Sequence, residues 1–249
     1  MVTLDLRTGS EPAPPARRIF SQAVFDTRNV LRNGENLLLT LIIPVVVLLL
    51  ALLTPLGSDR TAGEALVAAV GLGVLATSFT SQAISTGFDR RYGVLCMLGL
   101  TPLGIRGLLA ARTLVSVLII TMQIAILTGL TWVLAGWTST DIGYVVQSAI
   151  AILLAVWGFT AWALTLAGAL RAEANLAIAN AIFLLLMFGG GLAIPLDSLP
   201  WAGLAQWLPT GALVQAMSTP PIAGLSFIVL LLWGALGTAL ATRFFRWEP

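Results

Sequence analysis

Six long stretches without a charged residue divide this chain of 249 residues, and the short segments between them hold nearly all of its arginines. The charge-free stretches are Leu37–Gly57, Ala65–Phe88, Thr113–Thr140, Ile142–Leu170, Ala174–Leu196 and Ser198–Thr242. A helix that crosses a membrane needs about 20 mostly apolar residues, and each stretch reaches that length. The pattern predicts an all-α, polytopic membrane protein with six transmembrane helices, at about residues 37–57, 65–88, 113–137, 143–170, 174–195 and 222–241.

Composition favours a single membrane domain behind a short polar N-terminus. Apolar residues make up 58% of the chain and charged residues 10%, which leaves little sequence for a second, water-exposed domain. Residues 1–15 are polar and rich in proline. We expect them to be a disordered cytoplasmic segment, and we expect residues 16–249 to form the membrane domain. No cleavable signal peptide is predicted, because no apolar segment adjoins residues 1–15.

The arginines are distributed asymmetrically about the six stretches. If the N-terminus is cytoplasmic, every arginine except Arg60 lies on the cytoplasmic side, which is 12 of the 13. Basic residues that flank membrane spans are retained in the cytoplasm, and an even number of spans returns the chain to the same side. We therefore predict a multi-pass membrane protein with both termini in the cytoplasm. Because the arginines act as topology signals, no nucleic-acid partner is expected.

Residues 16–32 have an amphipathic pattern. At helical periodicity, apolar residues fill one arc, while the arginines and Asp26 fall on the other. Such a helix lies flat in the headgroup layer of a membrane, although a simple juxtamembrane anchor is the alternative. The residues predicted to form this interfacial elbow helix are Arg17, Arg18, Phe20, Val24, Arg28 and Leu31.

Residues 89–112 are too polar at their start to lie in a membrane and too apolar later to form a free loop. We predict a short helix near Asp89–Leu98 that ends at Gly99. A second helix would then enter the third span, with Thr101 as its N-cap and Pro102 at its first position.

Prolines interrupt the last charge-free stretch, at positions Pro200, Pro209, Pro220 and Pro221. No straight helix can pass through all of them. Residues 196–219 are therefore predicted to form one or two short re-entrant helices, an outer gate that includes Pro200, Trp201, Trp207 and Pro209. Re-entrant backbone must be buried in protein or face water, so we expect partners for it from a second subunit.

Three consecutive glycines, Gly189, Gly190 and Gly191, fall in the fifth predicted span. Glycines weaken a helix and allow another backbone to approach closely. They predict a packing notch, with a hinge or a dimer contact as the alternative.

The chain lacks the residues on which most membrane enzymes and ion-coupled carriers depend. It has no histidine and no lysine, so it has neither the commonest general base and metal ligand nor the lysine of a phosphate-binding loop. No Asp, Glu or Arg falls in the middle of a predicted span, whereas proton- and sodium-coupled carriers usually need one. We predict no catalytic residue, no metal and no cofactor on this chain. Energy for any transport is expected to come from a partner protein.

The segment Arg91-Tyr-Gly-Val-Leu-Cys-Met-Leu-Gly-Leu-Thr-Pro-Leu103 resembles the R-x-G-x-(large apolar)-x-x-L-x-x-T-P-[LI] segment of ABC-2 type transporter permeases. These permeases are the membrane subunits of bacterial ABC exporters. The predicted flat N-terminal helix and the proline-rich outer segment are similar to the elbow helix and the re-entrant helices of that family. The resemblance covers roughly residue 16 to the C-terminus. It implies a permease dimer, either homomeric or with a paralogous permease, driven by a separate ATPase that carries ATP and Mg²⁺.

The resemblance also implies that residues 89–112 couple the chain to that ATPase. Apolar side chains would fill a groove on the partner, and two arginines would pair with its acids or only mark the membrane boundary. The C-terminal tail is not expected to reach the ATPase. The predicted coupling residues are Arg90, Arg91, Tyr92, Gly93, Val94, Leu95, Leu98, Thr101 and Pro102.

The charge-free spans favour an apolar or amphipathic cargo, such as a drug, a lipid or a lipid-linked glycan. A membrane scaffold or a subunit of a biosynthetic or maturation complex, including a haem-export-like role, is the alternative function.

Overall fold

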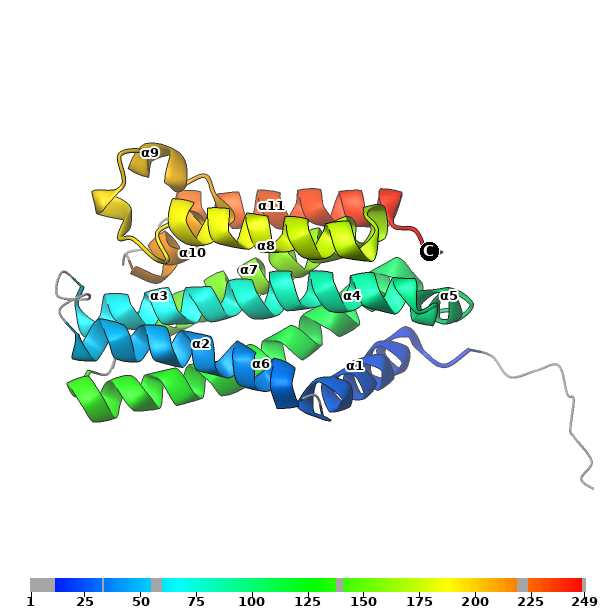
Figure 1. The fold of residues 1–249 in the computed structure, drawn as a ribbon, viewed down its shortest axis with the longest axis horizontal. Helices are drawn as coiled ribbons and strands as arrows, with labels where there is room; N and C mark the ends of the chain where they lie inside the picture. The colour runs from blue at the N-terminus through cyan, green and yellow to red at the C-terminus, as the bar shows by residue number, and fades with distance from the viewer. Residues whose placement is uncertain (1–11, 33, 55–59, 138–140, 219–223, 248–249) are drawn as a thin grey trace, which may run out of the picture.

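The computed structural model describes residues 12–32, 34–54, 60–137, 141–218 and 224–247, with the side chains of residues 34–39 excepted. Within these residues the chain is helical and has no strand. The long helices run side by side in one elongated bundle (Figure 1). The predicted polar N-terminus, the predicted end of the first span at residue 57 and the junction at residues 219–223 lie wholly or partly outside the described residues.

The described residues contain eleven α-helices, which are labelled in Figure 1. They are α1 (Pro15–Arg32), α2 (Gly34–Leu53), α3 (Ala62–Leu75), α4 (Gln82–Arg91), α5 (Val94–Gly99), α6 (Gly104–Ala135), α7 (Ile142–Ala169), α8 (Ala172–Gly189), α9 (Ala202–Ala205), α10 (Pro209–Ser218) and α11 (Gly224–Phe244). A π-helical segment, Ala76–Ser81, joins α3 to α4, and a 3₁₀ turn, Leu196–Ser198, precedes α9.

Five helices in the described part of the chain are long and apolar enough to cross a membrane. They are Ala62–Arg91, Gly104–Ala135, Ile142–Ala169, Ala172–Gly189 and Gly224–Phe244. The described side chains of α2 add a shorter apolar stretch, Thr40–Leu53. The prediction of an all-helical membrane protein is therefore confirmed for the described residues.

Helix α3 lies at the centre of the bundle and is buried over almost its whole length. It packs against α2, α6, α7 and α10. Its first turn is held by a capping box, in which the Thr61 side chain accepts from the Glu64 N–H and the Glu64 carboxylate accepts from the Thr61 N–H.

Small residues allow α7 and α11 to pack closely. A Cβ atom added at Gly158 would lie 3.4 Å from the Cα of Gly234. Beside this contact, the Trp162 indole N–H donates to the carbonyl of Trp233 at 3.0 Å. Helices in lipid associate through such close packing and through interhelical hydrogen bonds, because lipid tails are as apolar as the helices themselves.

Long amide side chains connect different helices. Gln123 donates to the Thr40 carbonyl at 3.1 Å, and Gln147 donates to the Ala216 carbonyl at 2.7 Å. Asn175 on α8 donates to the Ala83 carbonyl on α4 at 2.6 Å. Many hydroxyls instead bond within their own helix, as Thr131 does with the Leu127 carbonyl at 2.9 Å. The shorter serine and threonine side chains reach the carbonyl one turn earlier, so they contribute less to contacts between helices.

The segment from 196 to 218 forms short helices at one end of the bundle (Figure 1). Helix α10 is buried against α3, α7 and α11 of the same chain. The expectation that this segment draws its partners from a second subunit is therefore wrong for α10. Helix α9 and its neighbours are more exposed, including Trp201 and Trp207.

The three glycines lie at the end of α8 and not inside a longer helix. Helix α8 ends at Gly189, six residues before the predicted end of the fifth span. A Cβ atom at Gly190 would lie 1.8 Å from Oγ1 of Thr210, so only glycine admits α10 at this distance. Thr210 in turn donates to the Leu186 carbonyl at 3.1 Å. Gly190 therefore serves the predicted packing notch within one chain, and Gly191 is buried beside it.

Candidate functional site

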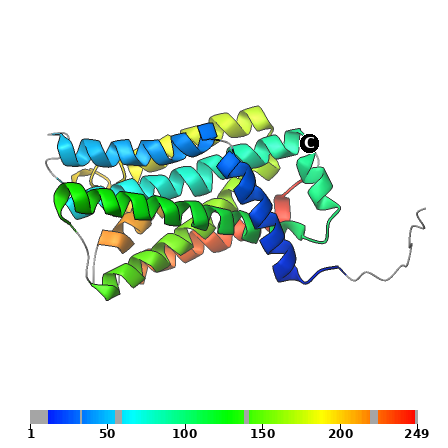
Figure 2. The same ribbon diagram turned by 90° about the horizontal axis from the view of Figure 1, so that it is seen from below.

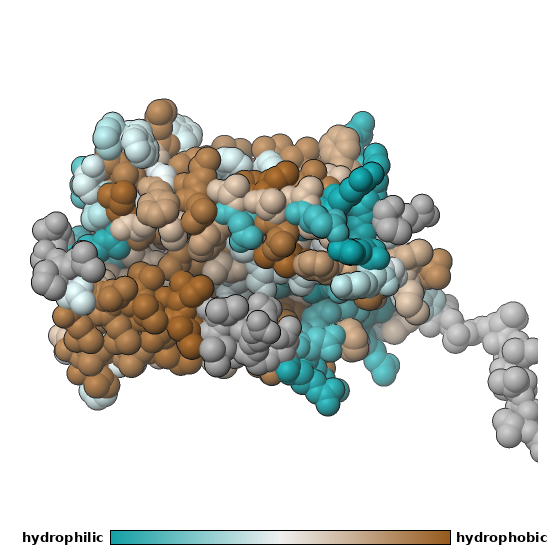
Figure 3. Space-filling model, viewed as in Figure 1, coloured by the Kyte–Doolittle hydropathy of each residue, from teal (hydrophilic) through white to brown (hydrophobic). Residues whose placement is uncertain are grey.

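One end of the bundle collects α1, α5 and the end of α11 (Figure 1). Figure 2 shows α1 crossing the long helices steeply at this end, while α5 extends beyond them. Hydrophilic surface also gathers here, whereas apolar surface covers much of the rest of the visible face (Figure 3). We refer to this part of the molecule as the basic end, because it holds Arg17, Arg18, Arg90, Arg91, Arg106 and Arg171.

Helix α5 projects from the basic end because a glycine interrupts the helical backbone after α4. Gly93 has a φ of 77°, in the left-handed region that favours glycine. Helix α4 continues through Arg91, so the predicted short helix begins at Val94 and not near Asp89. It ends at Gly99, as predicted.

The predicted cap of the following helix is wrong. Helix α6 begins at Gly104 after an N-cap position at Leu103, and Pro102 lies in the preceding turn. The Thr101 hydroxyl donates backwards to the Leu98 carbonyl at 2.7 Å. Thr101 therefore closes the end of α5, where the last carbonyls of a helix lack partners.

Large apolar side chains are exposed on the projecting turn and on α5. The exposed fractions are 73% for Tyr92, 73% for Met97 and 87% for Leu100. Val94 and Cys96 are also exposed. An exposed apolar surface on a short projecting helix is typical of an interaction site. The sequence prediction included Tyr92 and Val94 but missed Met97 and Leu100, although Val94, Met97 and Leu100 follow each other at a spacing of three residues.

Leu95 faces the opposite way and is fully buried. It packs in a cluster with Leu108 of α6, Leu164 of α7 and Ala241 of α11. Leu98 lies partly buried at the edge of the same cluster. The prediction that Leu95 fills a groove on a partner is therefore wrong, because its side chain anchors α5 to the bundle.

The C-terminal tail also packs beside α5. Phe245 and Trp247 join the cluster around Leu95, with their ring centroids 5.0 Å apart. A Cβ atom at Gly99 would lie 3.2 Å from the Trp247 indole. The tail therefore supports the projecting helix directly.

The two arginines that precede α5 have partners inside the chain. Arg90 donates to the carbonyls of Ala167, Gly168 and Leu170 at the end of α7, at 3.0–3.3 Å. These carbonyls belong to the last turn of a helix, where basic side chains are favourable. Arg91 forms an exposed ion pair with Glu173 at the start of α8. Both arginines therefore connect α4 to the α7–α8 turn, and their predicted pairing with a partner stays a prediction.

Helix α1 is fixed to the bundle by a cluster of three charged residues, which we call the ionic cluster. Nε of Arg112 on α6 lies 3.4 Å from Oδ2 of Asp26, and Nη2 of Arg112 forms a close ion pair with Asp89 on α4. Gln22 donates to Asp26 at 3.0 Å. The Asp26–Arg112 contact is a charge contact without the alignment of a hydrogen bond.

Burial raises the pKa of Asp26, and Asp89 adds to that rise, while Arg112 and the Gln22 hydrogen bond oppose it. The sequence pattern placed Asp26 on the outward polar arc, so this role was missed. No single-helix pattern contains the signal, because the cluster joins three helices.

The rest of α1 divides its apolar residues between two surfaces. Ala23 is buried against Ala111 and Val115 of α6, with Ile19 and Val30 beside it. Phe20 and Leu31 are exposed, as are the arginines Arg17 and Arg28. Val24 is partly buried, and Arg18 donates to the carbonyl of Pro102 just after α5. Helix α1 therefore contacts both the spans and the base of the projecting helix.

Taken together, the fold and the basic end define a multi-pass α-helical membrane protein with a helical projection at one end. The sequence matches the family described as ABC-2 type transporter over residues 20–220. Because the match covers most of the chain, the protein belongs to the ABC-2 type transporter family. None of the curated proteins compared with the chain matches it. Members of this family are membrane components of transporters and generally work with an ABC ATPase. The predicted resemblance to this family is therefore confirmed.

Proposed function

We propose that this protein is the permease subunit of an ATP-driven exporter, with six spans formed by α2, the α3–α4 helix, α6, α7, α8 and α11. Both termini would be cytoplasmic, so the basic end would be the cytoplasmic end. The distribution of arginines supports this orientation, because basic flanks are retained inside. Helix α1 would lie flat at the inner surface as the elbow helix, and α9 and α10 would form the re-entrant outer segment.

The exposed apolar surface of α5 carries the proposal. A permease without a nucleotide-binding site must receive motion from a separate ATPase through a cytoplasmic projection. Helix α5 and the residues that flank it offer Tyr92, Met97 and Leu100 to such a partner, and a short apolar helix in a groove is a common recognition mode. The ATPase, and not this chain, would hold ATP and Mg²⁺.

The packing of α5 supports a route for that motion into the membrane. Leu95 belongs to a buried cluster that also holds residues of α6, α7 and α11, and Gly93 joins α5 to the α4 end of the central helix. A displacement of α5 would therefore act on four spans together. The ionic cluster extends the same connection to α1.

The cargo would be apolar or amphipathic, and the working unit would be a dimer of this chain or a pair with a paralogous permease. No Asp, Glu or Arg falls in the middle of a predicted span, whereas a path for a hydrophilic cargo is usually marked by such residues. Bacterial plasma membrane is the expected location.

Co-purification with a co-expressed ABC ATPase tests the coupling site. The test variant combines Met97→Glu with Leu100→Glu, because both side chains are exposed and their replacement breaks no contact in the core. The matched control is Leu204→Glu on α9, whose leucine is 72% exposed at the opposite end.

We expect the amount of ATPase that co-purifies with the α5 variant to be lower than with the unmodified chain by about tenfold or more. The reason is that a few exposed apolar anchors supply most of an interface's affinity. ATP-driven transport of a lipophilic dye in proteoliposomes should fall with it. The control should retain ATPase and transport like the unmodified chain. If the α5 variant also does so while inserting normally, α5 is not the coupling site. If no ATPase associates with any form of the chain, a scaffold function is favoured instead.

A further inference from the structure

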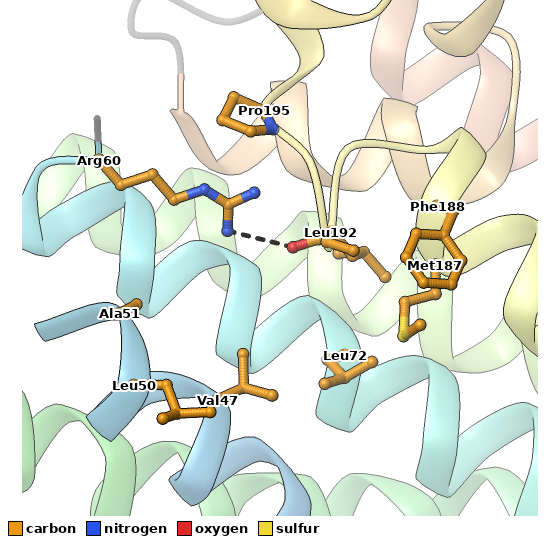
Figure 4. Close-up of a pocket in the computed structure, with 10 residues that line it drawn as sticks. Val47, Leu50, Ala51, Arg60, Leu72, Met187, Phe188, Leu192 and Pro195 are labelled. Atoms are coloured by element: carbon orange, nitrogen blue, oxygen red, sulfur yellow. Dashed lines mark hydrogen bonds between the residues drawn. The ribbon is translucent and has the colours of Figure 1, made fainter. Parts of the chain in front are cut away.

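A cavity of about 350 Å³ lies at the end of the bundle opposite the basic end. Its apolar walls come from α2, α3 and α8, and include Val47, Leu50, Leu72, Met187 and Phe188. Figure 4 shows the Arg60 side chain extending across this cavity towards Leu192. Leu50 and Phe188 are each about half exposed, so the cavity opens sideways between α2 and α8, where the surface is apolar.

Arg60 uses only part of its hydrogen-bonding capacity. Nη1 donates to the Leu192 carbonyl at 3.1 Å. Nη2 is shielded from water and has no acceptor among the described residues. Partial burial lowers the pKa of Arg60, and the nearby Glu64 carboxylate only partly opposes this. Glu64 is itself engaged in the capping box with Thr61.

This combination fits an anionic group on an apolar chain. A guanidinium presents its N–H donors as a planar fork that matches phosphate and carboxylate oxygens. An anion in the cavity would pair with the charge of the Arg60 guanidinium, in surroundings where a charged hydrogen bond is little screened. The apolar walls and the sideways opening suit acyl chains, which no free inorganic anion possesses.

We propose that this cavity binds the phosphate of an anionic phospholipid or of a similar lipid-linked phosphate, with Arg60 as the binding cation and the α2–α8 opening as the entry for the acyl chains. The assignment to the outer leaflet rests on the proposed topology. The chemistry of the ligand is inferred from the cavity alone. If the protein is the proposed exporter, this chemistry restricts its cargo or its regulatory lipid to anionic amphipaths.

Melting of the purified chain in neutral detergent tests the site, because a ligand that binds the folded protein raises the melting temperature with concentration. The probes are phosphatidylglycerol, phosphatidylcholine and inorganic phosphate. We expect phosphatidylglycerol to stabilise the chain well below the concentration at which phosphatidylcholine does, and inorganic phosphate neither to stabilise it nor to compete.

Arg60→Gln should weaken phosphatidylglycerol binding about ten- to a hundredfold, the value of one or two charged hydrogen bonds. Arg60→Lys should lose less phosphatidylglycerol affinity, because lysine keeps the positive charge but lacks the planar fork of N–H donors. The control is Arg171→Gln, which removes an exposed arginine at the basic end. If Arg60→Gln fails to fold, Val47→Trp provides the second variant, since it fills the cavity and leaves Arg60 in place.

Equal phosphatidylglycerol affinity in Arg60→Gln and in the unmodified chain would overturn the proposal. If inorganic phosphate alone raised the melting temperature, the site would bind free phosphate and the assignment of a lipid as the ligand would be wrong. The ATPase is absent from this assay, so a negative result leaves coupling through α5 untouched. Failure of coupling would likewise leave a positive lipid result standing.

Discussion

Replacing Arg112 by methionine should destabilise the protein strongly, because Asp26 and Asp89 would lose the cation they share. The Asp26 side chain is 6% exposed and that of Asp89 is 30% exposed. Breaking a buried ion pair by removing one partner costs about 3–5 kcal/mol. The Asp89 contact adds little to this figure, because solvent screens it.

For a chain of this length, one kcal/mol shifts the melting temperature by about 2–4 °C, so the expected decrease is roughly 6–20 °C at pH 7. Thermal unfolding in detergent measures it, and hydrogen exchange should show the largest loss of protection in α1. Arg106→Met is the matched control, since Arg106 is an exposed arginine on the same helix. A decrease of less than about 2 °C in a normally inserted Arg112→Met variant would refute the energetic role of the cluster.

The pH dependence gives an independent check on Asp26. Its pKa in the folded protein is raised above the ordinary value of 3.8, so the folded state binds this proton more tightly than the unfolded state. The associated stability is present below pH 3.8 and is lost as pH rises through the raised pKa. Arg112 lowers the pKa of Asp26, so the loss of Arg112 raises this pKa further. The difference in melting temperature between Arg112→Met and the unmodified chain should therefore narrow from pH 7 towards pH 4, and adding Asp26→Asn should recover part of it at pH 7.

Three further predictions concern α5, the α8–α10 contact and the topology. Leu95→Ala should cost about 2–5 kcal/mol of stability, measured by thermal unfolding, because a fully buried leucine leaves a cavity. Gly190→Ala should cost about 1–3 kcal/mol, because its new methyl group would overlap Thr210. In sealed right-side-out vesicles, the exposed Cys96 should react with an impermeant maleimide only after permeabilisation, whereas Ala62→Cys in a Cys96→Ser background should react without it.

The two stability predictions have matched controls. Met97→Ala should leave stability nearly unchanged, because Met97 is exposed. Gly203→Ala should be neutral, since a Cβ atom there meets nothing within 4 Å. Equal destabilisation by Met97→Ala and Leu95→Ala would contradict the orientation of α5. Labelling of Cys96 in intact right-side-out vesicles would reverse the proposed topology.

The sequence by itself determined the class of the protein. Charge-free stretches long enough to cross a membrane force the backbone into helices, because lipid offers no other hydrogen-bond partners. The Arg91–Leu103 segment indicated the family, and Gly99 marked the end of the short helix. These features are local, so the periodicity and spacing of neighbouring residues contain them.

Only the tertiary structure decided which faces of the helices are used. Leu95 and Met97 are both apolar residues of α5, yet one is buried by α6, α7 and α11 and the other is exposed. In the sequence, Asp26 has the pattern of a surface residue. In the fold, it lies in a cluster with Arg112 and Asp89 from two other helices. Arg60 gains its place beside an apolar cavity from α2 and α8. The free energy of each side chain depends on partners distant in the chain, and a one-dimensional pattern does not contain those partners.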